Sequence, residues 1–118
     1  MAGSTFTLKL SPRLFADGEK CFGPGAAELL EGVDREGSLR GAAGGMGMSY
    51  SNAWTTLREC ERALGFPLLE RKAGGPAGGC SVLTPRGRAL LEGYRRLEAR
   101  LAAENASLLE EVGRLKEE

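Results

Sequence analysis

Residues 38–64, SLRGAAGGMGMSYSNAWTTLRECERAL, predict two short helices joined by a turn. In the first, small and apolar side chains recur at helical spacing, and Ser38 stands where its hydroxyl can cap the first backbone N–H groups. Gly47 favours a turn, and Ser49 can cap a second helix that would stop at Gly65. Because this second helix has one apolar and one polar face, the pair is typical of a helix-turn-helix.

The residues before this pair predict one strand and one helix. Residues 5–10 alternate polar and apolar side chains, which is typical of a short strand. Residues 14–23 are expected to be irregular, with a turn at the Asp-Gly pair of positions 17 and 18. Pro24 suits the first position of a helix, which residues 25–36 would continue with apolar side chains on one face.

The residues after the pair predict a β-hairpin. Pro67 ends the second helix, and residues 68–72 and 80–83 are expected as strands. The Gly-rich residues 74–79 would connect them. A hairpin directly after the second helix of a helix-turn-helix forms a wing.

A last helix is predicted to begin at Pro85, to be capped by Thr84, and to run to the C-terminus. A mostly apolar stripe along it repeats in part every seven residues, as in a coiled coil. One helix cannot bury such a stripe, so it is expected to pair with a second copy, with Asn105 helping to fix the register. The predicted dimerisation residues are Leu90, Tyr94, Leu97, Leu101, Asn105, Leu108, Val112 and Leu115.

These elements predict a mainly α (α+β) fold. It is a winged helix-turn-helix with a short N-terminal strand, a two-stranded wing and a long C-terminal dimerisation helix. Residues 1–83 are expected to form the DNA-binding domain, and residues 84–118 the dimerisation helix.

The composition excludes several classes of protein. The 118 residues include no His, so the commonest general base and metal ligand is missing, and we expect no enzyme activity, metal or cofactor. Cys21, Cys60 and Cys80 match no zinc spacing and are expected as free thiols. No apolar run approaches the roughly 20 residues that cross a bilayer, and no export signal is evident, so the expected location is the cytoplasm.

The charges are unevenly distributed, although the net charge is zero. Residues 37–88 carry seven basic and three acidic side chains, whereas residues 14–36 carry two basic and six acidic ones. Residues 101–118 are also acidic, with five acidic and two basic side chains. Because charges further than about 10 Å apart are screened at ordinary salt, a phosphate backbone would respond to the basic middle of the chain.

Residues 37–91 resemble the winged helix of LysR-type regulators. The motifs are Gly37-Ser38-Leu39, Ala42-Ala43, Met46-Gly47-Met48-Ser49, Leu57, Leu64-Gly65, Pro67-Leu68-Leu69-Glu70-Arg71 and Leu83-Thr84-Pro85-Arg86-Gly87.

A closer resemblance, over roughly residues 5–100, is to ModE-type molybdate-responsive regulators. It rests on Phe6-Thr7-Leu8-Lys9-Leu10 with Leu14-Phe15-Ala16-Asp17, on Ser49-Tyr50-Ser51-Asn52-Ala53-Trp54, and on the Gly-rich wing from Arg71 to Gly79. The molybdate-binding domains of that family have no counterpart here, so no molybdate site is expected in this chain.

A winged helix of this kind would bind double-stranded DNA. The recognition helix, about residues 49–64, is expected in the major groove, and the wing, about residues 68–83, on the backbone or in the minor groove. Asn52 can pair with adenine, Arg58 can reach guanine or phosphate, and Trp54 is expected in the core. The predicted DNA-binding residues are Ser38, Arg40, Ser49, Tyr50, Ser51, Asn52, Thr55, Arg58, Arg71 and Lys72.

The sequence thus predicts a homodimeric, sequence-specific DNA-binding transcriptional regulator that recognises a palindromic operator. The alternative is a protein interaction module whose winged helix and C-terminal helix dock on a partner regulator.

Overall fold

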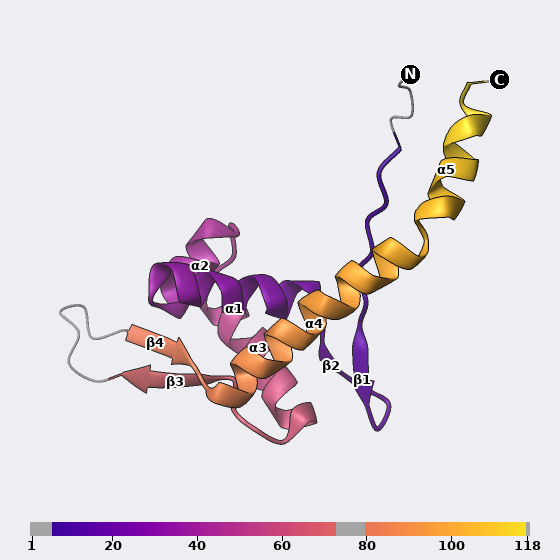
Figure 1. Cartoon of the computed structure of the whole chain (residues 1–118). Coiled ribbons are helices and arrows are strands. Elements are labelled where there is room, and N and C mark those ends of the chain that lie inside the picture. Colours follow the sequence, from indigo (N-terminus) through magenta and orange to yellow (C-terminus); the bar gives the residue numbers. More distant parts are fainter. Residues whose placement is uncertain (1–5, 73–79, 118) are drawn as a thin grey trace.

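Three helices form the centre of the molecule, with a hairpin on one side and a long helical arm on the other (Figure 1). The computed structural model describes residues 6–72 and 80–117. In chain order the elements are β1 (Leu14–Ala16), β2 (Glu19–Phe22), α1 (Pro24–Glu36), α2 (Leu39–Gly45), α3 (Tyr50–Leu64), β3 (Leu69–Lys72), β4 (Cys80–Leu83), α4 (Pro85–Glu104) and α5 (Ala106–Leu115). The predicted winged helix-turn-helix fold is confirmed.

Local signals set the ends of the central helices. The Ser38 hydroxyl accepts a hydrogen bond from the Gly41 N–H at 3.0 Å and caps α2. The Ser49 hydroxyl caps α3 in the same way, through the N–H of residue 52 at 3.1 Å. Gly37 and Gly65 end α1 and α3 with φ of 80° and 87°, in the left-handed region that favours glycine.

The core lies where α1, α2 and α3 meet the wing and α4. Its largest fully buried side chains are Phe22, Leu29, Leu30, Val33, Leu57, Leu68 and Tyr94. Helices α1 and α2 pack so closely that a Cβ at Gly32 would lie 2.7 Å from the Cβ of Ala42. The small residues of this pair therefore allow a close approach that larger side chains would prevent.

The wing is anchored to the core at its base. Strands β3 and β4 are antiparallel, with Leu69 opposite Leu83. The Thr84 N–H donates to the Leu68 carbonyl at 2.9 Å, and its hydroxyl donates to the Pro67 carbonyl at 2.8 Å. The predicted Gly-rich connection, residues 74–79, lies outside the described residues.

The N-terminal strand was wrongly placed by the sequence pattern. Residues 6–10 are not a strand, and residues 14–22, expected to be irregular, form the antiparallel hairpin β1–β2 around the predicted turn at positions 17 and 18. A strand needs a hydrogen-bonding partner. The turn brings β1 and β2 together, whereas residues 6–10 have no strand beside them in the described part of the chain. Residue 5, the first of the predicted strand, lies outside that part.

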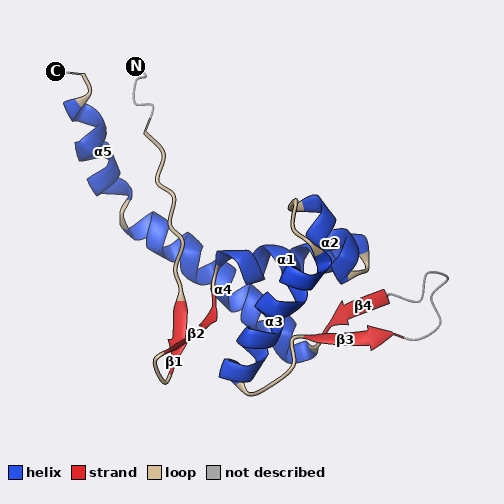
Figure 2. Cartoon of the chain, turned by 180° about the vertical axis from the view of Figure 1, so that it is seen from behind, coloured by secondary structure: helices blue, strands red, loops and turns tan. Residues whose placement is uncertain are grey.

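The C-terminal helix is also not continuous. Helix α4 ends at Glu104 and is capped by Asn105, whose side-chain amide donates to the Leu101 carbonyl at 2.6 Å. Helix α5 follows in a new direction (Figure 2). Asparagine favours such a helix end because its side chain bonds to nearby backbone groups. The arm gives the molecule its elongated shape, with extents of 60 × 33 × 22 Å.

Two ion pairs and a tyrosine hold α4 against the rest of the fold. Arg88 makes a bidentate pair with Asp34 of α1, at 2.8 and 2.9 Å, and Arg95 makes another with Glu31, at 2.6 and 2.7 Å. Tyr94, predicted at a dimer interface, is only 2% exposed. Its ring stacks edge-to-face on the ring of residue 22, and its hydroxyl donates to the carbonyl of residue 12 at 2.7 Å.

Candidate nucleic-acid interface

Helix α3 presents a polar face to solvent. Ser51, Asn52, Thr55 and Arg58 are all exposed, while the opposite face of the helix is buried in the core. The Thr55 hydroxyl donates to the Ser51 carbonyl at 3.0 Å, so its oxygen still has lone pairs free to accept. This face offers hydrogen-bond donors and acceptors from a rigid element.

The two capping serines lie beside this face. Ser38 is half-buried at the start of α2, and Ser49 is exposed at the start of α3. Each hydroxyl oxygen accepts a helix N–H, which leaves its proton available to an outside acceptor. Helix N-termini also favour anions, because unpaired N–H groups point outwards there.

An arginine–aromatic cluster borders the polar face of α3. It joins α2, α3 and β3 through the side chains of Arg40, Tyr50, Trp54, Arg58 and Arg71. The Arg40 guanidinium lies over the Tyr50 ring, 4.3 Å from its centroid. Arg58 and Arg71 lie 5.3 and 5.8 Å from the centroid of Trp54. The two aromatic rings meet edge-to-face with centroids 6.3 Å apart.

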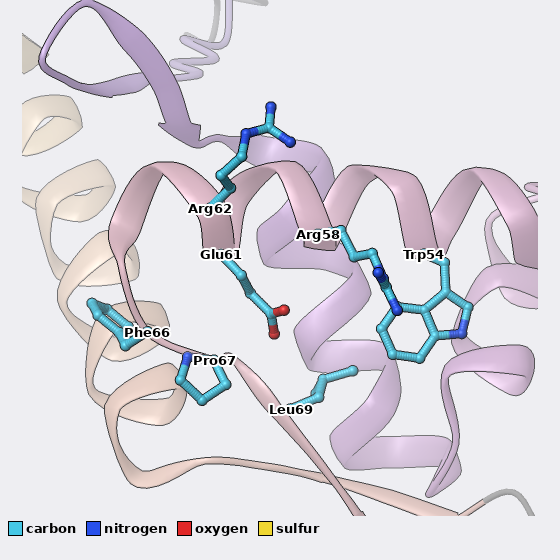
Figure 3. A pocket seen from close by; sticks show the side chains of 7 residues that line it. All are labelled: Trp54, Arg58, Glu61, Arg62, Phe66, Pro67 and Leu69. Carbon is cyan, nitrogen blue, oxygen red and sulfur yellow. The ribbon is translucent and has the colours of Figure 1, made fainter.

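Trp54 departs from the prediction that it belongs to the core. It is half-buried, packing against the core from the edge, and it lines an open groove between α3 and the base of the wing (Figure 3). Glu61 also lines this groove, and its carboxylate accepts the Leu68 N–H at 2.7 Å. Glu61 therefore fixes the loop that leads into the wing.

Arg62 is a basic residue that the sequence interpretation left out of the site. It is exposed and lies eleven residues after Ser51, at the spacing that places Ser51, residue 55, Arg58 and Arg62 on one helix face. The same periodicity in the sequence could have identified it. Lys72, predicted as a wing contact with DNA, is exposed at the end of β3.

The predicted dimerisation residues divide into two groups. Tyr94 belongs to the core of the chain itself, Leu90 packs against that core, and Asn105 and Leu101 bond to each other where α4 ends. The remaining four are exposed large hydrophobic side chains, between 39% and 68% accessible: Leu97, Leu108, Val112 and Leu115.

The cysteines are free thiols. Cys21 and Cys60 are buried, and burial raises the pKa of the Cys60 thiol, which keeps it in the unreactive protonated form. Among residues 6–72 and 80–117, no group of three His, Cys, Asp or Glu side chains could hold a metal ion.

The fold and this exposed face define a class of protein, the winged helix-turn-helix. Residues 25–88 match the model of the family described as bacterial regulatory helix-turn-helix protein, lysR family. The chain belongs to this family.

Similar proteins include a molybdenum-pterin-binding protein and a transcriptional regulator. The chain is 39% identical over 74 residues to the molybdenum-pterin-binding protein MopB of Rhodobacter capsulatus, covering 63% of this chain and 27% of MopB. It is 38% identical over 88 residues to the DNA-binding transcriptional dual regulator ModE of Escherichia coli K12, covering 75% of this chain and 31% of ModE. The chain thus spans less than a third of these relatives.

A solved structure has the same fold. The DNA-binding domain of CbnR, in a complex with DNA, superposes with a TM-score of 0.55 and 26% sequence identity, covering 74% of this chain and 93% of that one. In the part of the chain that the structure describes, no helix has the length and apolar character needed to span a membrane.

Proposed function

We propose that this chain is a sequence-specific DNA-binding transcriptional regulator that inserts α3 into the major groove. One observation carries the proposal: the exposed polar face of α3 is bordered by arginines from α2 and from the wing. A recognition helix needs groups that can read base edges, with cations close by that can bind phosphates. Similarity to ModE and to the CbnR domain bound to DNA supports this reading.

The contacts divide into two kinds. Asn52 and residues 51, 55 and 58 of α3 face the base edges, where Asn52 can pair with adenine and Arg58 with guanine. Arg40, Arg71 and Lys72 contact phosphates beside this face and set the position of the helix. The capping serines and Arg62 add further phosphate contacts.

The regulator acts as a homodimer on a palindromic operator. One winged helix covers only a few base pairs, and a dimer places two in successive turns of the groove. The exposed apolar side chains of α4 and α5 offer the surface for a second copy. Residues 1–83 bind DNA and residues 84–118 dimerise, although the first turns of α4 also complete the core of the DNA-binding part. A regulator that binds a bacterial chromosome would act in the cytoplasm.

The test is fluorescence anisotropy with labelled promoter duplexes at several salt concentrations. The name of the relative MopB directs the first set of duplexes to promoters of molybdenum-related genes. We expect selective binding. The logarithm of the association constant should fall linearly with the logarithm of the salt concentration, because phosphates that are bound by the protein release counterions. A folded protein that fails to bind any duplex at low salt would contradict the proposal and favour the protein interaction module.

A further inference from the structure

We infer that Tyr50 is a positioning residue that holds the two flanking arginines, Arg40 of α2 and Arg71 of the wing, in place for phosphate contacts. The inference rests on the proposed function and adds how the interface is assembled. Tyr50 is the first residue of α3 and is half-buried, so its ring sits on the rigid recognition helix between the two neighbouring elements.

Each side of the Tyr50 side chain meets one arginine. The face of its ring lies under the Arg40 guanidinium, 4.3 Å from Cζ to the centroid. Its hydroxyl oxygen accepts a hydrogen bond from Arg71 Nη2 at 3.4 Å. One aromatic side chain thus orients cations from α2 and β3, which no backbone hydrogen bond or ion pair connects in the described part of the chain.

Trp54 completes the support from one turn further along α3. Its ring meets the Tyr50 ring edge-to-face, and the Arg71 guanidinium lies 5.8 Å from its centroid. Neither Arg40 nor Arg71 makes an ion pair with a carboxylate in the described residues, so both keep their full charge for an outside anion. Aromatic faces hold a guanidinium without neutralising it, which suits a side chain that must still bind phosphate.

A direct contact between the Tyr50 hydroxyl and phosphate is the competing explanation, and the two differ in salt dependence. The hydroxyl carries no charge, so its own contact releases no counterion. Displacing Arg71 removes a cation from the phosphates and lowers the log–log salt slope by about one. We therefore expect Tyr50→Phe to weaken binding by roughly three- to tenfold and to reduce the slope in the same direction as Arg71→Ala.

The experiment is a double-mutant cycle on the best-bound duplex, using wild type, Tyr50→Phe, Arg71→Ala and the double variant. We expect Tyr50→Phe to weaken DNA binding very little in the Arg71→Ala background. The inference would be overturned if Tyr50→Phe weakened binding by the same factor in the wild-type and Arg71→Ala backgrounds and left the salt slope unchanged. The proposed function would remain intact. Arg13→Ala is the charge control, because Arg13 bonds the Ser11 carbonyl far from the cluster and should leave affinity unchanged.

A second readout needs no DNA. Trp54 is the single tryptophan of the chain, so its fluorescence reports on this cluster alone. We expect Tyr50→Phe to shift the emission in the same direction as Arg71→Ala, with thermal unfolding of both variants close to wild type. A spectrum that responds to Arg71→Ala but not to Tyr50→Phe would show that Tyr50 does not position Arg71. Loss of wild-type binding to every duplex would overturn both this inference and the proposed function.

Discussion

Gly87 shows how tightly one residue can be constrained by its neighbours. It lies in the first turn of α4, and a Cβ added there would lie 2.5 Å from the Leu68 carbonyl oxygen. That carbonyl also accepts the Thr84 N–H and cannot move freely. We predict that Gly87→Ala lowers the free energy of unfolding by about 2 kcal/mol, as measured by urea denaturation.

Gly44 supplies the matched control. It is a helical residue of α2 with no heavy atom within 4 Å of an added Cβ. Gly44→Ala should therefore raise the free energy of unfolding by up to about 1 kcal/mol, because alanine loses less backbone entropy in a helix. If both substitutions changed stability equally, close packing at Gly87 would not be the cause of its effect.

Asn52 is the residue on which base specificity is predicted to depend. Asn52→Ala should cost about 1–3 kcal/mol on the preferred operator and relax the preference at one base pair, with little change in salt slope. Lys72→Ala should instead weaken binding to all duplexes by a similar factor and lower the slope of the salt dependence. Competition binding against single-base operator variants measures the difference. If Asn52→Ala weakened binding to all of those operator variants by the same factor, Asn52 would be identified as a phosphate contact instead.

At the scale of elements, ion pairs join α4 to α1 across a long stretch of sequence. The Arg88 guanidinium bonds both oxygens of Asp34 and lowers the pKa of that carboxyl below its ordinary value of 3.8. The folded state therefore favours the carboxylate more than the unfolded state does. The stabilisation is fully present above the ordinary pKa and is lost as the pH falls through the lower pKa of the folded protein.

We predict that Asp34→Asn lowers the free energy of unfolding by about 0.5 kcal/mol near neutral pH, because exposed ion pairs contribute little. The difference from wild type should disappear well below the folded-state pKa, when Asp34 is protonated. Urea denaturation of both proteins, near neutral pH and well below the folded-state pKa, measures this difference in the free energy of unfolding. Glu28→Gln on the same helix is the control, since Glu28 makes no ion pair in the described residues. A pH-independent difference would show that the pair is not its origin.

At the scale of the whole molecule, the arm formed by α4 and α5 leaves apolar side chains exposed. Leu108 and Val112 of α5 are 55% and 49% exposed and lie on one face of that helix. We predict that Val112→Glu converts a dimer into a monomer, as measured by sedimentation velocity, and weakens operator binding by about 100-fold through lost avidity.

Ala106→Glu is the matched control for this substitution. It places the same charge on the opposite, exposed face of α5, so the dimer should persist. A wild-type protein that sediments as a monomer at concentrations saturating the operator would contradict the dimer proposal.

The helix-turn-helix and most of the candidate interface were predictable from local patterns. The serine caps, the left-handed glycines and the spacing of apolar side chains act within a few residues, so they mark α1, α2 and α3 correctly. The exposed polar face of α3 follows from the same periodicity. Arg62 was missed although it obeys that periodicity.

Features that depend on distant partners were not predictable. Alternation at residues 6–10 indicates a strand, but only a neighbouring strand can satisfy its backbone groups. Tyr94 lies on a stripe that looks suited to dimerisation, yet the folded chain buries it under the N-terminal segment.

The sequence by itself therefore determined the class of fold, because capping, helical periodicity and turn residues act locally. Only the tertiary structure decided which side chains are used in contacts within the fold and which remain exposed. It assigns Tyr94 to the core and ends α4 at Glu104, where Asn105 caps it. It also gathers arginines from α2 and the wing around Tyr50. The physical reason is that burial and side-chain contacts depend on chain segments far apart in sequence, which local patterns do not encode.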